Sequence, residues 1–348
     1  MRPVLWSILA PLLGCAADDE PNVSGTSVAT TDASDSPADA GGTGGEACGD
    51  SPETLASCID ADRYAADLEF IADIRPPDSE HWQRVQDLCV ERLEAAGYDV
   101  ETQGYETGVN VIGRRAGVTT PAEVVLVSAH YDHIPECPGA DDNATGVAAA
   151  LEIGRVLALA ELPRTVMIAC WDEEETNLRG STAWANQAAE DGLDVVMNFN
   201  FDMIGFASDE PNSQIIPTGL DALFPDAAAE IAANEYRGDF IMVVANAAAQ
   251  LATTDFIDQA QRVALPTTLL EVPEGMELSE AYSDTRRSDH ASMWAVGYPA
   301  LLLTDTAEPR NRNYHCRGGP DVVEDLDEEF ALAVARATVA ATAIVAGL

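Results

Sequence analysis

The chain has 348 residues, of which 47% are hydrophobic, enough for a large core. Its formal net charge is −42, and all 18 basic residues are arginine. Such an acidic chain repels the phosphates of nucleic acids and of anionic lipids, which argues against a nucleic-acid-binding protein. We interpret most of its carboxylates as a solvated acidic surface.

The first 15 residues are typical of a signal peptide. Arg2 precedes a short apolar run, Val4–Leu13, which is shorter than the about 20 residues that span a bilayer. The run ends in Leu-Leu-Gly-Cys, which resembles a bacterial lipobox with Cys15 as the lipidated residue. The alternative is an ordinary secretory signal. Both predict an exported protein: a cell-envelope lipoprotein, periplasmic or on the outer surface, or a secreted protein.

Residues 16–50 are rich in Ala, Ser, Thr, Asp and Gly and contain almost nothing apolar. Such a segment cannot bury enough surface to fold, so we predict a disordered acidic tether. A single folded domain, 51–348, follows. It begins with two predicted helices, 60–74 and 79–96, and two strands, 98–103 and 109–115.

From residue 124 onward, strand and helix patterns alternate. Apolar runs predict strands at 124–129, 165–169, 195–201, 267–272 and 300–304. Helical periodicity predicts helices at 144–160, 180–189, 221–234, 255–264 and 328–346, and one that starts at His290. This alternation predicts an α/β three-layer sandwich, with a mixed, mostly parallel central sheet flanked by helices on both faces.

Five short segments at strand or helix ends carry side chains that bind metal ions. In an open α/β sheet, such ends meet in a crevice beyond the carboxyl ends of the strands. Two imidazoles and several carboxylates without cysteine suit zinc, and their number suits two ions about 3.5–4 Å apart. The segments are His130-Tyr131-Asp132, Asp141-Asp142-Asn143, Glu173-Glu174-Glu175, Asp202 and Ser288-Asp289-His290.

Five motifs follow one another between about residue 109 and the C-terminus: HYD, PGADDNATG, EE-x-x-LRGS, NFDMIG and SDHASMWAVGYPA. This set resembles the co-catalytic di-zinc exopeptidases typified by bacterial leucyl aminopeptidase, which are related to glutamate carboxypeptidase and glutaminyl cyclase. The resemblance implies that 51–348 is a zinc-peptidase catalytic domain.

The resemblance also implies residue roles. Glu174 would be the general base, and Asp132 would orient the ring of a ligand histidine. A register shifted by one, with Glu173 as the base, is the alternative, but the Leu-Arg-Gly-Ser anchor favours Glu174. Two Zn²⁺ ions, or similar divalent ions, would be bound by His130, Asp142, Glu175, Asp202 and His290, with Asp142 bridging both.

Other histidines and the cysteines give further expectations. Tyr314 and His315 resemble the family's Tyr-His element at the mouth of the active site, where a substrate contact and a structural role are both open; His133 is expected to be a bystander. An even number of cysteines beyond the lipobox indicates disulfides. We predict the pairs Cys58–Cys89 and Cys137–Cys316, and a free, buried Cys170.

The predicted function is hydrolysis of N-terminal peptide bonds by an exported zinc aminopeptidase. A hydroxide that bridges two cations is nucleophilic at neutral pH because metal binding lowers the pKa of water towards about 7, and a neighbouring Glu transfers the proton. The alternatives are a carboxypeptidase, a glutaminyl-cyclase-like enzyme, or a non-catalytic binding lipoprotein. We expect a monomer with a peptide substrate, no nucleic-acid partner, and membrane contact only through the lipid.

Overall fold

The computed structural model describes residues 48, 49 and 51–348, which belong to one unit, Glu46–Leu348. The predicted signal peptide, Cys15 and nearly all of the predicted tether lie outside the described residues. Among the helices that the structure describes, none has the length and apolar character needed to cross a membrane.

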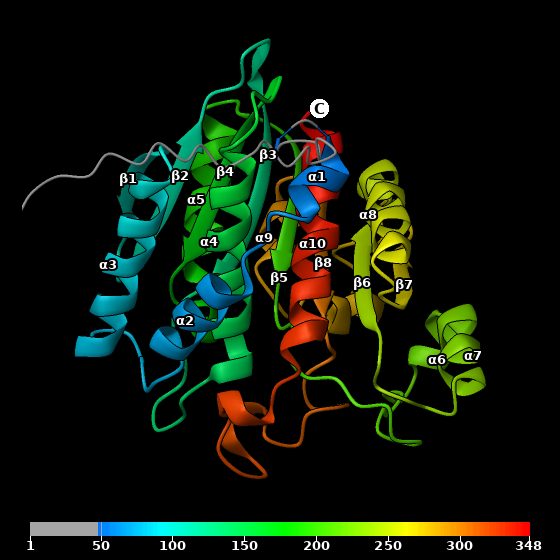
Figure 1. Cartoon of the computed structure of the whole chain (residues 1–348). Helices are drawn as coiled ribbons and strands as arrows, with labels where there is room; N and C mark the ends of the chain where they lie inside the picture. The colour runs from blue at the N-terminus through cyan, green and yellow to red at the C-terminus, as the bar shows by residue number, and fades with distance from the viewer. Residues whose placement is uncertain (1–47, 50) are drawn as a thin grey trace, which may run out of the picture. The chain divides into compact units, whose positions relative to one another are not determined.

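An eight-stranded mixed sheet runs through this unit in the order β1-β2-β4-β3-β5-β8-β6-β7 (Figure 1). Strands β4, β3, β5 and β8 are parallel, and β6 and β7 run antiparallel to β8. The β1–β2 hairpin pairs antiparallel to β4. The strand bounds are β1 Asp99–Gly104, β2 Val109–Arg115, β3 Thr120–His130, β4 Arg164–Trp171, β5 Asp194–Phe201, β6 Ile241–Asn246, β7 Thr267–Val272 and β8 Ala300–Thr304.

Helices cover both faces of the sheet and enclose a separate hydrophobic core on each. One core holds α1, α2, α3, α4, α8 and α10, and the other holds α5, α7 and α9. This arrangement confirms the predicted fold class. The helix bounds are α1 Pro52–Ala56, α2 Ala61–Ile71, α3 Glu80–Ala95, α4 Gly146–Leu157, α5 Arg179–Glu190, α6 Leu220–Leu223, α7 Pro225–Ala233, α8 Gln250–Arg262, α9 His290–Ala295 and α10 Glu328–Val345.

Strand β3 shows why the central strands read as continuous apolar runs. Val125 and Val127 point into one core, whereas Val124 and Leu126 point into the other, and all four are fully buried. A parallel strand with helices on both faces needs apolar side chains at every position. Among the buried residues of β3, polar side chains appear only towards its carboxyl end, first at Ser128, which donates to Asn198 and Asn200 of β5, and then at His130.

The element predictions differ from the structure in several places. Strand β6 and helix α1 were not predicted, and the helix predicted at 144–160 starts only at Gly146. The helix predicted at 221–234 is divided into α6 and α7 at Phe224 and Pro225. The break has a local cause, because proline lacks the N–H that would continue the helical hydrogen bonding.

Two disulfides are present among the described residues. Cys137–Cys316 is the predicted pair, and Cys170 is free and buried, as predicted. The prediction of Cys58–Cys89 is wrong, because Cys58 is bonded to Cys48, ten positions earlier. Cys89 lies on the inner face of α3, fully buried in the core, and is also free.

Candidate metal centre

Polar side chains gather where three neighbouring parallel strands end. His130 is the last residue of β3, the Glu173–Glu175 segment follows β4, and Asp202 follows β5. Asp142 lies in the turn that precedes α4, and His315 belongs to a short 3-10 turn after β8. The topology therefore brings together residues from five distant segments, as expected at this edge of an open α/β sheet.

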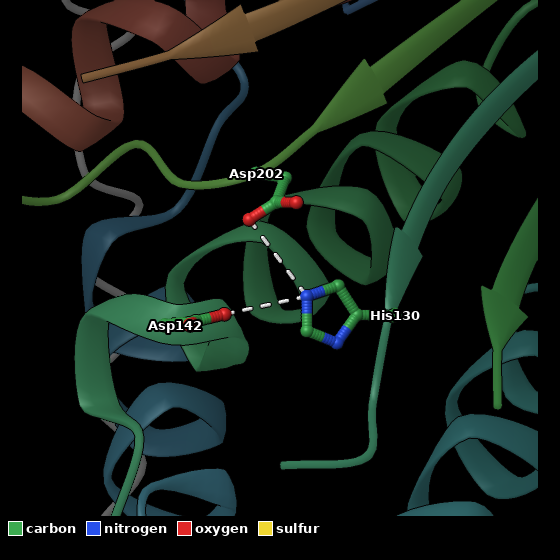
Figure 2. Close-up of side chains that lie close together, drawn as sticks. All are labelled: His130, Asp142 and Asp202. Atoms are coloured by element: carbon green, nitrogen blue, oxygen red, sulfur yellow. Dashed lines mark ion pairs between the residues drawn. The ribbon is translucent and has the colours of Figure 1, made fainter. Parts of the chain in front are cut away.

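The first group consists of His130, Asp142 and Asp202 (Figure 2). His130 Nε2 lies 3.3 Å from Asp142 Oδ1 and 3.8 Å from Asp202 Oδ1. The other ring nitrogen, Nδ1, lies 3.2 Å from the backbone oxygen of Asp132 and 3.5 Å from its carboxylate. An Nδ1–H that donates to Asp132 leaves the lone pair of Nε2 free to bind a cation, as is usual for metal-binding histidines.

The second group consists of Asp142, Glu175, His315 and His133. His315 Nε2 lies 3.0 Å from Asp142 Oδ2 and 3.1 Å from Glu175 Oε1. His133 Nδ1 lies 3.0 Å from the same Glu175 oxygen and 3.9 Å from Asp142 Oδ2. Asp142 thus directs one carboxylate oxygen to each group, which is the geometry of a carboxylate that bridges two cations.

Several of these atoms are buried without a hydrogen bond in the described part of the chain. They are His130 Nε2, His133 Nδ1 and Nε2, His315 Nε2 and Glu175 Oε1. Buried polar atoms are almost always paired, and an unpaired one costs about 1–3 kcal/mol. Here the nitrogens lie within about 3 Å of carboxylate oxygens without the alignment of a hydrogen bond. Lone pairs that converge on a common point fit a divalent cation.

The charges of the second group depend on one another. Burial opposes a charge on His315, but Asp142 and Glu175 outweigh burial and raise the pKa of its imidazole to about 10. Burial would raise the pKa of Asp142, but His130 and His315 hold it well below its usual value. Without a cation, protonated histidines therefore balance the carboxylates, and a bound cation would displace those protons.

Glu174 faces a cleft that both groups border. A cleft of about 380 Å³ is lined by Glu174 together with Asp142, Asp202 and Tyr314. Burial and the nearby carboxylates, opposed by His130, raise the pKa of Glu174 well above its usual value. Glu173 instead pairs away from the cleft with Thr107 and Arg179.

The carboxylate of Asp132 fixes the backbone below the cleft. It accepts hydrogen bonds from the backbone N–H groups of Glu174 at 3.0 Å and Glu175 at 3.3 Å. The same residue contacts the ring of His130. Asp132 therefore holds the β3 and β4 ends of the site in register.

The model of Peptidase family M28 matches residues 110–342. The chain belongs to this family. It is 31% identical to an uncharacterized protein of Escherichia coli, YfbL, over 56% of this chain and 59% of that protein. It is 34% identical to the aminopeptidase YwaD of Bacillus subtilis over 33% of this chain and 26% of that protein. The chain thus spans less than two thirds of the length of either relative.

Among solved structures, the LapA aminopeptidase of Legionella pneumophila has the same fold. It superposes with a TM-score of 0.62 and 18% sequence identity, over 85% of this chain and 75% of that one. This similarity confirms the fold expected for an M28 member.

His290 is the predicted ligand that the structure does not bring to this M28 site. Its Nε2–H donates to the backbone oxygen of Thr285 at 2.8 Å, and its ring packs edge-on against Trp294. In the described chain, no carboxylate lies within ion-pair distance of this ring. His315 takes the expected place of His290, and His133, predicted to be a bystander, lies beside it.

Arg75 was not predicted to contribute to the site. Its fully buried guanidinium donates to the backbone oxygens of Tyr131, Pro138, Gly139 and Asp142, all within the segment that links β3 to α4. Two further bonds reach the carbonyls of Ile71 and Asp73, beside Arg75 itself. Arg75 lies before the residues matched by the M28 model and fixes the shape of the loop between His130 and Asp142.

Asp141 lies beside the bridging residue and belongs to neither group. Its carboxylate accepts hydrogen bonds from the Gly205 backbone at 3.0 Å and the Asn311 side chain at 2.9 Å. Asp321 accepts bonds from the backbone N–H groups of Asp141 and Asp142. Asp141 therefore faces away from the two groups and anchors the bridging residue beside it.

An apolar pocket of about 470 Å³ opens next to Asp202. Tyr314 and Arg287 line both this pocket and the cleft that Glu174 faces, so the two cavities meet at these side chains. The rest of its wall comes from β6, β7, β8, the 214–231 segment and two polar stretches, 284–288 and 306–309. The apolar lining residues are Met203, Ile215, Pro217, Leu220, Ile231, Met242, Val244, Leu270, Leu302, Ala307 and Pro309.

Proposed function

We propose that this M28 member is an exported di-zinc aminopeptidase that removes bulky apolar residues from peptide N-termini. The main support for the proposal is that Asp142 directs one carboxylate oxygen to each of the two ligand groups. A bridging carboxylate between two sets of imidazole and carboxylate donors is typical of paired catalytic metal ions.

The residues that would hold one ion are His130, Asp142 and Asp202, and those that would hold the other include Asp142, Glu175 and His315. When bound, two such ions supply Lewis acidity, which polarises the scissile carbonyl and makes a water molecule more acidic. Imidazole and carboxylate donors without thiolate suit zinc or a similar divalent ion.

Glu174 has the position of the general base. Its carboxylate reaches the cleft next to both groups, where it can accept the proton of the attacking water and return it to the leaving amine. The raised proton affinity of this buried carboxyl in the absence of metal supports a role in holding a proton. Asp132 keeps Glu174 in place through its backbone.

The surroundings favour an amino terminus over a carboxyl terminus as the bound end of the peptide. The cleft is lined by Asp142, Glu174, Glu175 and Asp202, which attract a substrate ammonium group. The cleft also holds Arg286 and Arg287, and Arg287 is paired with Glu308 at 3.2 Å, so the four carboxylates outnumber the remaining arginine.

The apolar pocket supports the substrate preference. Its volume of about 470 Å³ is within the usual range for small-molecule sites and holds the side chain of leucine, phenylalanine or methionine. Because the pocket adjoins Asp202, a substrate whose ammonium group lies near that carboxylate places its first side chain in the pocket.

The test combines metal content with a peptide panel. We expect about two zinc ions per chain, and hydrolysis of Leu- and Phe-p-nitroanilide that a chelator abolishes and zinc restores. N-acetyl-Leu-p-nitroanilide and N-blocked peptides with a free C-terminus should not be cleaved. Equal cleavage of the N-acetylated substrate would refute the aminopeptidase assignment, and zinc binding without any hydrolysis would favour the binding lipoprotein.

Glu174→Gln separates catalysis from metal binding. It should retain both zinc ions and lose activity by about 10²- to 10⁴-fold, the usual contribution of a general base. Glu173→Gln is the matched control, because that side chain faces Thr107 and Arg179 and should leave turnover nearly unchanged. Export is tested separately, by fractionating cells that express the full chain and Cys15→Ser.

A further inference from the structure

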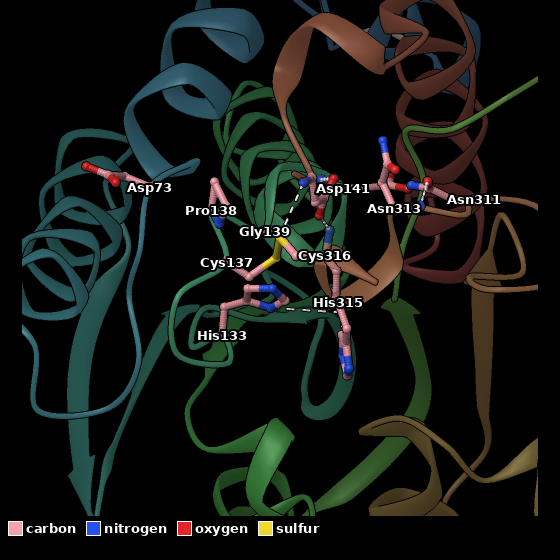
Figure 3. The surroundings of a disulfide bond; sticks show 12 residues. Asp73, His133, Cys137, Pro138, Gly139, Asp141, Asn311, Asn313, His315 and Cys316 are labelled. Carbon is pink, nitrogen blue, oxygen red and sulfur yellow. Dashed lines mark hydrogen bonds and ion pairs between the residues drawn. A yellow bond between two sulfur atoms is a disulfide. The ribbon is translucent and has the colours of Figure 1, made fainter. Parts of the chain in front are cut away.

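Figure 3 shows His133 on the loop that also carries Cys137, with His315 nearby. The ring of His133 is fully buried, and Nδ1 lies 3.0 Å from Glu175 Oε1 and 3.9 Å from Asp142 Oδ2. The ring of His315 lies edge-on to it, with 5.7 Å between the centroids. His133 is therefore as close to the shared Glu175 oxygen as His315 is.

Both ring nitrogens of His133 lack a hydrogen-bond partner in the described chain. A buried histidine with only a structural role pairs at least one nitrogen, as His290 does with Thr285. Nδ1 of His133 is near a carboxylate oxygen but is not aligned with it as a donor. Such an unpaired nitrogen, aimed at two carboxylates, has the surroundings of a cation ligand.

The separations of His133 Nδ1 from the two carboxylate oxygens fit ligands of one ion, and His133, Asp142 and Glu175 form one compact donor group. Ligands at about 2.0–2.1 Å from a tetrahedral zinc ion lie about 3.4 Å from each other. The distances of His133 Nδ1 from Glu175 and Asp142, 3.0 and 3.9 Å, bracket this value. The corresponding distances of His315 Nε2 are 3.1 and 3.0 Å.

The position of the His133 ring is fixed by its neighbours. A Cβ atom on Gly139 would lie 2.5 Å from Cδ2 of the ring, so glycine is required for the loop to close over it. The backbone N–H of His133 donates to the Arg75 carbonyl at 3.3 Å. The Cys137–Cys316 disulfide ties this loop to the residue that follows His315.

We propose that His133 is a fourth protein ligand of the second metal position, beside Asp142, Glu175 and His315. This inference rests on the two-metal function proposed above. It makes the two positions unequal, because the first has three protein donors and the second has four. A fourth protein donor holds a zinc ion more firmly, as in structural zinc sites. The second position should therefore fill first.

The test uses the metal-free full-length protein. Zinc titration against a competing chelator should resolve one tight and one weaker ion in the wild type. X-ray absorption of the protein loaded with one equivalent of zinc should show two imidazole ligands, from His133 and His315. His133→Ala should weaken the tight position by more than 100-fold, beyond the 10- to 100-fold typical of residues that only orient a ligand.

His81→Ala is the matched control, because this buried histidine lies on α3 and contacts the Ile71 carbonyl and Arg84. It should keep both affinities and the imidazole count. One imidazole per tightly bound zinc in the wild type, or an unchanged tight site in His133→Ala, would overturn the proposal. The wild-type count decides the question even where the variant fails to fold.

Two different results would separate the role of His133 from the two-metal function. A wild-type protein that binds two zinc ions and cleaves peptides, but has one imidazole on the tight ion, loses only the role of His133. A wild-type protein that binds no second ion loses the two-metal function as well.

Discussion

Replacement of Arg75 by methionine tests whether a residue outside the metal groups shapes them. The guanidinium makes six hydrogen bonds, all to backbone carbonyls, and none of its partners is a carboxylate. Four of these carbonyls belong to the loop between His130 and Asp142. Methionine fills a similar volume but donates nothing, so the loop loses the donors that define its path.

The magnitude follows from the bonds and from the burial of the charge. Hydrogen bonds to a charged group contribute about 1.5–3 kcal/mol each, so six of them contribute about 9 kcal/mol at the lower limit. Burial lowers the pKa of Arg75 to about 10 despite the attraction of Asp142 and Asp321, so the net cost of keeping this charge buried is about 3 kcal/mol. Methionine removes both the hydrogen bonds and the cost of the buried charge. Relaxation of the loop and entry of water reduce the net loss of unfolding free energy. We expect a loss of about 3–6 kcal/mol in unfolding free energy.

The assay is denaturant unfolding of the metal-free protein, combined with zinc titration. Zinc affinity should fall about 10- to 100-fold at one or both positions, because the loop carries Asp142 and His133. Arg75→Lys is the matched control: it keeps the charge but has three donors and no planar fork, so it should lie between the wild type and Arg75→Met. A loss below about 1 kcal/mol with unchanged zinc affinity would refute a positioning role for Arg75.

Three other measurements check the described geometry. Cys316→Ser opens a bridge between residues 179 positions apart, so it should cost up to about 5 kcal/mol and weaken zinc at His315, whereas Cys48→Ser should leave zinc affinity unchanged. Burial lowers the pKa of His290 to about 4, so between about pH 6.5 and 4 the unfolded chain binds a proton at this residue and the folded chain does not. The unfolding free energy of the metal-free protein should therefore fall by up to about 3 kcal/mol over this pH range. His290→Gln should reduce this pH dependence in denaturant titrations. Leu220→Trp narrows the apolar pocket and should raise KM for Phe-p-nitroanilide about tenfold more than for the alanine substrate; equal effects would disconnect the pocket from the substrate's first side chain.

Local patterns predicted most of the fold because the relevant forces are local. Val124–Ala129 reads as a buried strand since every position packs against a helix layer. Strand β6, Ile241–Asn246, was missed although it is fully buried. Its apolar run merges without a turn signal into the alanine-rich segment that precedes α8, so periodicity alone does not separate the strand from the helix.

Sequence patterns alone did not predict which of His290 and His315 lies at the metal site. Both histidines follow β7 in the sequence, and both belong to motifs that resemble the family. Only tertiary packing separates them: His290 starts α9 and packs on Trp294, whereas His315 faces Asp142. The predicted Cys137–Cys316 disulfide carried the missing signal, because it places the residue before Cys316 next to the loop that contains Asp142.

The charge of the chain and the chemistry of the site are connected. A net charge of −42 raises the local concentration of cations and lowers that of anions. The carboxylates of Asp142, Glu175 and Asp202, which are buried or mostly buried, extend this bias into the cleft, where the lower dielectric strengthens it. Two kinds of cation are attracted by this negative potential. One is a divalent metal ion bound by the carboxylates, and the other is the ammonium group of a peptide. A substrate carboxylate is repelled by these side chains, and of the two arginines at the cleft Arg287 is already paired with Glu308. The acidic surface and the carboxylates of the cleft therefore favour the same end of the peptide, its amino terminus.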